Sequence, residues 1–245
     1  VLLARNRHAA IAASGEGTRV TLAGVAIRDM LVNGAGRLGR AIQGTDGVVL
    51  DATATLIDGA SEGGFVVATG ARADARDLLI TRIRPSTNGL GLAVQSFDRA
   101  RFNGQRVAVE DVSGAAFTAV TSGEGASAIA LDDVFVRSVR SSTLLFPEAA
   151  TGGARGPAVA YGFHAARGCS LVARRAVLDA GEYGLYNAGG TLRLTDAVVS
   201  RQQRALGAWE PGTAPEATTL VAVTPVDNVI NVLEQRAGLP TASSL

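Results

Sequence analysis

Lysine is absent from this sequence, and cysteine, proline and aromatic residues are scarce. All 23 basic residues are arginine, so the chain has no amine for Schiff-base or lysine general-base chemistry. The single cysteine, Cys169, excludes an intrachain disulfide and a cluster of several thiolates from this chain, and we expect it to be a buried, inert thiol. No apolar run could span a membrane, and no signal peptide is recognised. The net charge of +1 gives no reason to expect binding to nucleic acid.

One short apolar pattern returns along the chain. We call its last apolar residue the anchor, and the anchors are Ile27, Ile57, Ile80, Val109, Val136, Leu178 and Val199. The fourth anchor is open, because a pattern shifted by a few residues would place it at Gly114. A structural unit that recurs at a period of about 20–50 residues is typical of a solenoid.

A second, shorter apolar segment follows most anchors, often introduced by Gly or Ala. These segments are 64–67, 89–92, 116–119, 162–164 and 184–186. Two or three strands per repeat, without a sustained helical period, predict an all-β fold. We expect a parallel β-helix of about eight coils over residues 1–210 and a C-terminal capping segment over residues 211–245, because solenoid ends are usually covered.

Several segments also resemble a known group of proteins. Residues 3–7, 15–22, 25–29 and 36–40 are similar to the degenerate β-helix repeats of secreted or envelope proteins of myxobacteria and related bacteria. The resemblance covers about residues 1–210 and implies a right-handed, single-stranded β-helix and an exported protein. It carries over no functional residue. Because the chain opens inside a repeat, we expect further residues, including an export signal, to precede Val1 in the natural protein.

Stacking of the coils turns equivalent positions into neighbours about 4.8 Å apart. The position after each anchor holds Arg28, Asp58, Thr81, Glu110, Arg137, Asp179 and Ser200. We expect an outward ion ladder there, with Arg28 beside Asp58 and with Glu110 beside Arg137 beside Asp179. Its role would be to hold register and keep the face soluble, and substrate binding is the alternative.

A second column carries the candidate site. It comprises Ala12, Val66, Thr118, His164, Tyr186 and Gly207. We expect His164 and Tyr186 to be outward neighbours, with Tyr161, Glu182 and Tyr183 close by. A His beside a carboxylate can act as an acid or base, and tyrosines stack on sugar rings.

Two site hypotheses follow. A binding site would use Tyr161, His164, Tyr186 and Arg140, whereas a catalytic site would use His164, Glu182, Tyr183 and Tyr186. The alternative to both is a scatter of amphipathic residues on a solvated sheet. The sequence indicates no metal site and no cofactor.

Two insertions follow anchors, over 30–39 and 140–157. Both should leave the coil at the same corner, where clustered loops could form a binding surface. The adjacent acids Asp132 and Asp133 should point to opposite faces of a strand, so we do not expect a glycosidase pair, although one of them could satisfy a corner.

The leading hypothesis is a non-enzymatic β-helix scaffold, secreted or in the cell envelope, whose task is adhesion or binding of a polysaccharide or cell-surface component. The alternative is a polysaccharide lyase or glycoside hydrolase that acts on the outer face. Self-association through the coil ends is a third hypothesis.

Overall fold

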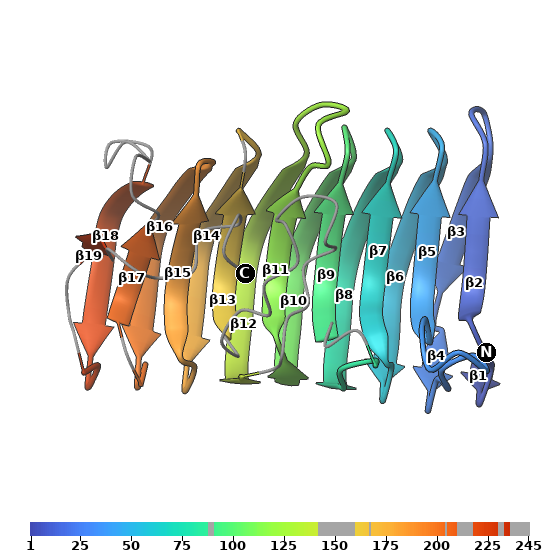
Figure 1. Ribbon diagram of the computed structural model, residues 1–245, viewed down its shortest axis with the longest axis horizontal. Helices are drawn as coiled ribbons and strands as arrows, with labels where there is room; N and C mark the ends of the chain where they lie inside the picture. Colours follow the sequence, from blue (N-terminus) through green and yellow to red (C-terminus); the bar gives the residue numbers. More distant parts are fainter. Residues whose placement is uncertain are drawn as a thin grey trace.

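The computed structural model describes residues 1–87, 91–141, 160–166, 168–203, 205–209, 218–229 and 233–235. Within these ranges the chain forms strands and no helix. The strands build two parallel sheets, wound into a β-solenoid of about seven turns. Figure 1 shows the coils following one another along the long axis. The predicted all-β, parallel, repeating architecture is confirmed, and right-handedness stays a prediction.

The first sheet collects the strands that carry the anchors. In spatial order these are β1 (Leu2–Ala4), β4 (Ala26–Arg28), β6 (Val49–Asp58), β8 (Arg72–Ile83), β10 (Arg101–Ser113), β12 (Ala128–Arg140), β14 (Ser170–Asp179), β16 (Thr191–Ser200) and β18 (Thr218–Val226), and β3 (Arg19–Ala23) also pairs with β6.

The second sheet collects the shorter strands. Its members are β2 (Ala9–Ser14), β5 (Arg40–Thr45), β7 (Glu62–Ala68), β9 (Gly91–Phe97), β11 (Ala115–Val120), β13 (Tyr161–Ala166), β15 (Tyr183–Ala188), β17 (Ala205–Trp209) and β19 (Leu233–Gln235). The strands β18 and β19 continue both sheets past residue 210. Residues 211–217, with the predicted turn, lie outside the described residues. The capping role of the C-terminal segment stays a prediction.

The anchors stack in register and point into the solenoid. Val109 pairs with Ile80 on one side and with Val136 on the other, so the fourth anchor is Val109 and the Gly114 alternative is wrong. All seven anchors are at most 1 % exposed. Phenylalanines of both sheets fill the interior beside them: Phe65 meets Phe102 edge to face at 5.3 Å between ring centroids.

Each long strand of the first sheet bends at a residue with positive φ. These residues form the first left-handed column: Gly24, Ala54, Asp77, Arg106, Asp133, Arg175, Asp196 and Ala222. Five residues further along, a second left-handed column follows: Arg5, Asp29, Gly59, Arg82, Asp111, Ser138, Ala180, Arg201 and Asp227. Non-glycine residues adopt this conformation at a cost of about 1–2 kcal/mol.

The two columns are corners of the coil. We call the residues between them, such as 55–58 in β6, the short face. Arginine or alanine at such a corner gives no sign in the sequence of its conformation, and the columns were not predicted. The recurrence of Gly and Asp at these positions is the signal that could have revealed them, because both tolerate positive φ better than most residues.

Both insertions lie where the chain passes from the first sheet to the second. Residues 30–39 connect β4 to β5, and the insertion that begins at Arg140 lies between β12 and β13. The predicted common corner is confirmed. Residues 142–159, most of the second insertion, lie outside the described residues.

Candidate functional site

The predicted aromatic site lies on the outer surface of β13 and β15. His164 pairs in register with Tyr186, and Tyr161 pairs with Tyr183, as expected for neighbours on consecutive coils. The rings of Tyr161 and Tyr186 stack at 4.5 Å with planes 11° apart. His164 lies 5.3 Å from Tyr161 and 5.5 Å from Tyr186 between ring centroids. The sequence therefore identified a real cluster of four rings.

The four rings are buried, although their side chains lie outside the hydrophobic interior of the solenoid. Tyr161, Tyr183 and Tyr186 are at most 2 % exposed, and His164 is 4 % exposed. Burial lowers the pKa of the His164 imidazole from 6.5 to about 4, because the charged form is poorly solvated there. At neutral pH the ring is uncharged. Tyr161 and Tyr186 stack on each other, and the burial of all three tyrosines leaves no ring face open to a sugar.

Glu182 accepts hydrogen bonds from both sides of the second insertion. Its Oε2 accepts a hydrogen bond from the Ala160 backbone N–H at 3.1 Å and another from the Ser141 hydroxyl. These two donors precede β13 and follow β12, so the carboxylate ties the two sides of the insertion together. The sequence placed Glu182 beside the rings but did not predict this bond.

Glu62 accepts an equivalent hydrogen bond at the first insertion. Its Oε2 accepts a hydrogen bond from the Leu38 backbone N–H at 2.8 Å, and its Oε1 pairs with Arg40. Both acids come directly before or at the start of a strand of the second sheet and are nearly fully buried. A buried carboxylate at the re-entry of each insertion is therefore a structural element of this solenoid.

The column that carries the candidate site, which begins at Ala12, differs from its prediction at three places. Gln43 and Gln95 belong to it between the predicted members. Tyr186 pairs with Ala208 rather than with Gly207, which pairs with Leu185. No segment was predicted over 40–45, where Gln43 lies, and the predicted segment 89–92 ends before Gln95, which lies in β9.

The charged ladder predicted after the anchors has the expected register but different ion pairs. Asp58 lies between Arg28 and Thr81, and Arg137 lies between Glu110 and Asp179. The hydrogen-bonded ion pairs run instead to the second left-handed column: Arg82 binds Asp58 at 2.5 Å, and Arg201 binds Asp179.

These arginines lower the pKa values of the Asp58 and Asp179 carboxyls chiefly by hydrogen bonding. Both arginines have a positive φ, and each binds an acid of the preceding coil.

A second ladder runs along the first left-handed column, where Asp and Arg alternate over Asp77, Arg106, Asp133, Arg175 and Asp196. Arg106 binds both carboxylate oxygens of Asp77, at 2.5 and 2.8 Å. Arg175 binds Asp133 in the same two-pronged way, at 2.5 and 3.1 Å. The bonds from Arg106 and Arg175 lower the pKa values of Asp77 and Asp133.

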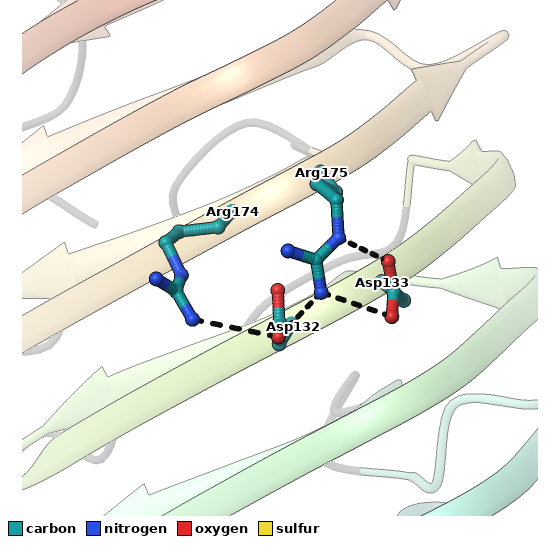
Figure 2. Close-up of polar contacts among 4 residues, drawn as sticks. All are labelled: Asp132, Asp133, Arg174 and Arg175. Atoms are coloured by element: carbon teal, nitrogen blue, oxygen red, sulfur yellow. Dashed lines mark hydrogen bonds and ion pairs between the residues drawn. The ribbon is translucent and has the colours of Figure 1, made fainter.

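Asp132 joins this second ladder. Figure 2 shows Arg175 reaching both Asp132 and Asp133, with Arg174 on the far side of Asp132. The expectation that the two acids point to opposite faces is wrong. Asp133 has φ 55°, which breaks the strand alternation and turns both carboxylates outward. The suggestion that one of them serves a corner is confirmed.

Arg140, the fourth predicted binding residue, contacts Asp111 and is not part of the ring cluster. It ends β12 at the insertion corner, is largely exposed, and pairs with Asp111 at 2.8 Å. Among the described residues no three His, Cys, Asp or Glu side chains are grouped to hold a metal ion. No helix of the described chain is long and apolar enough to cross a membrane.

Comparison of the chain with protein-family models, with curated proteins and with solved structures finds no match in any of the three. The assignment of function therefore rests on the geometry above.

Proposed function

We propose that this protein is a non-enzymatic β-solenoid scaffold of the extracellular space or the cell envelope, and that its task is adhesion or carbohydrate binding. The location is the one implied by the resemblance to bacterial surface proteins. The observation that supports the scaffold is that the candidate catalytic groups hold neighbouring segments together.

Glu182 shows this most directly. A general acid or base must reach its substrate within hydrogen-bond distance. The Glu182 carboxylate is 4 % exposed and accepts bonds from Ser141 and Ala160. His164 is buried among tyrosine rings. These contacts support a structural use of both groups.

The outward ion ladders support adhesion to an extended polymer. Arginine and aspartate side chains recur on successive coils about 4.8 Å apart, and both donors and acceptors of hydrogen bonds are present on this surface. An extended polysaccharide could follow such a row over several coils. Arg140 and Arg174, exposed on β12 and β14, would be among its contacts.

The test is a binding screen against bacterial and plant polysaccharides, combined with an assay for new reducing ends and unsaturated products. We expect binding without cleavage, and weaker binding for Arg140→Ala or Arg174→Ala. Release of products by the parent chain, lost in a correctly folded Glu182→Gln or His164→Phe variant, would overturn the proposal in favour of a lyase or hydrolase.

A further inference from the structure

We propose that two copies of this protein associate through the outer surface of the short face. The inference goes beyond the scaffold function and does not depend on it. It rests on an exposed apolar row and on the arrangement of charges on either side of that row.

The apolar row consists of the residues that directly precede the anchors, together with Leu2 at the N-terminal end. Because the anchors point inward, their neighbours point outward. The row comprises Leu2, Ala26, Leu56, Leu79, Ala108, Phe135, Val177 and Val198. Leu2 is 63 % exposed, Leu79 38 % and Val198 37 %. The other five members are half-buried. An apolar row that reaches the surface and that charged residues border is typical of an interaction site.

Where a coil has a charge on both sides of the row, the two charges have opposite sign. The first left-handed column lies two residues before the row, and the column after the anchors lies two residues after it. In three consecutive coils these flanking residues have opposite sign: Arg106 and Glu110, Asp133 and Arg137, Arg175 and Asp179. The flanking residues from Gly24 to Ser200 are all described, and no coil has two of like sign.

This arrangement makes the surface complementary to itself. A two-fold axis along the apolar row sets each residue before the row opposite the residue after the row in the partner, so Arg106 meets the position of Glu110. An axis across the row, between Ala108 and Phe135, sets Arg106 opposite the position of Asp133 and Glu110 opposite that of Arg137. In both arrangements apolar side chains meet apolar side chains and unlike charges meet, which is what a symmetric dimer interface requires.

The size of the surface indicates a weak dimer. From its first to its eighth member, at steps of about 4.8 Å, the row is about 34 Å long, and a span of five strand residues at steps of about 3.3 Å makes it about 13 Å wide. Two such surfaces would bury on the order of 900 Å² in total, below the roughly 1,200–2,000 Å² of stable interfaces. We therefore expect association that depends on protein concentration.

The experiment is sedimentation equilibrium over a range of protein concentrations. The parent chain should approach twice its mass of 24.9 kDa. Leu79→Glu should weaken the dimer by about tenfold or more, because a charge in the row loses its water on association. Ala130→Glu, on an exposed part of β12 outside the short face, is the matched control and should leave the dimer unchanged.

Two variants at Thr81 test the charge arrangement, because they should change the dimer affinity in opposite directions. Thr81 lies after the row in the coil of Asp77, and the two arrangements set it opposite an acid of the partner, Asp77 or Asp179. Thr81→Arg should tighten the dimer about three- to tenfold and Thr81→Glu should weaken it. Circular dichroism checks the fold of each variant.

A chain that remains monomeric at every concentration would overturn the proposal. So would a dimer that Leu79→Glu leaves intact, that Ala130→Glu weakens equally, or that responds to both Thr81 variants in the same direction.

Discussion

Glu62 and Glu182 perform the same task at two different coils: each accepts a hydrogen bond from the backbone of the segment that returns from an insertion, Glu62 from Leu38 at 2.8 Å and Glu182 from Ala160 at 3.1 Å. The two acids lie at equivalent corners of the second sheet. The equivalence supports a structural reading of Glu182, whose sequence neighbours had suggested catalysis.

Replacing Glu182 by Ala should lower the free energy of unfolding by about 1–3 kcal/mol, because the buried Ala160 N–H loses its acceptor. Glu182→Gln keeps an acceptor oxygen and should lose less. Urea unfolding measures the stability, and hydrogen exchange at the Ala160 amide reports the local bond. Faster exchange at Ala160 in the Ala variant is expected, and an Ala variant as stable as the parent would contradict the role.

Ala54 offers a test of the first left-handed column. Its φ is 49° and its side chain is exposed, so Ala54→Gly should relieve backbone strain and stabilise the protein by about 1 kcal/mol. Ala130 is also exposed in a long strand but lacks a positive φ. Ala130→Gly should therefore destabilise by about 0.5–1 kcal/mol. Thermal or urea midpoints that move in the same direction for both variants would contradict the strain.

The buried His164 predicts a loss of stability in mild acid. Its pKa is about 4 in the folded chain against about 6.5 when unfolded. As pH falls below 6.5, the unfolded chain takes up a proton that the folded chain does not, so stability is complete above pH 6.5 and is lost toward pH 4. The loss at pH 5 should be about 2 kcal/mol.

His164→Phe keeps a ring in the cluster and removes the titration, so it is the control for this window. The difference in unfolding free energy between the parent and the variant should fall between pH 7 and pH 5. Asp58 and Asp179, whose folded pKa values are lowered, lose their contributions only near and below pH 4. A difference that stays constant from pH 7 to pH 5 would rule out an uncharged, buried imidazole.

The contact of Arg175 with Asp133 should appear as an energetic coupling. Asp133→Asn and Arg175→Gln each should lower the urea midpoint, and the double variant should lower it by less than the sum, because the same pair is lost once. Raising NaCl to about 1 M should reduce the coupling, since both groups are exposed. Arg193, an exposed arginine of β16, should show no coupling to Asp133 and provides the control.

Most of the fold was predictable because the inward positions allow little choice. The seven anchors, among them Ile57 and Val109, are all Ile, Val or Leu, so the column repeats visibly in the sequence. The neighbours of His164 followed from the same register. The ring burial and the bond from Ala160 to Glu182 were not predictable, because both depend on how the segments fold back against one another.

The two left-handed columns were the main feature of the fold that the sequence pattern did not predict. A chain with Arg106 or Arg175 at positive φ looks like an ordinary strand, and the alternation rule then placed Asp132 and Asp133 on opposite faces. The observed bend at Asp133 instead allows Arg175 to bind both acids. Backbone conformation, rather than side-chain pattern, determined where the charges of this surface lie.

The constant interval between the two left-handed columns restricts how this protein can vary in length. In every described coil from Gly24 and Asp29 to Ala222 and Asp227 the two corners are five positions apart, with four residues between them, whereas the connections between sheets differ widely. A single-residue insertion inside the short face would move a corner off its left-handed residue and rotate the side chains after it. We therefore expect changes of length at the sheet-to-sheet connections, or as the gain or loss of an entire coil.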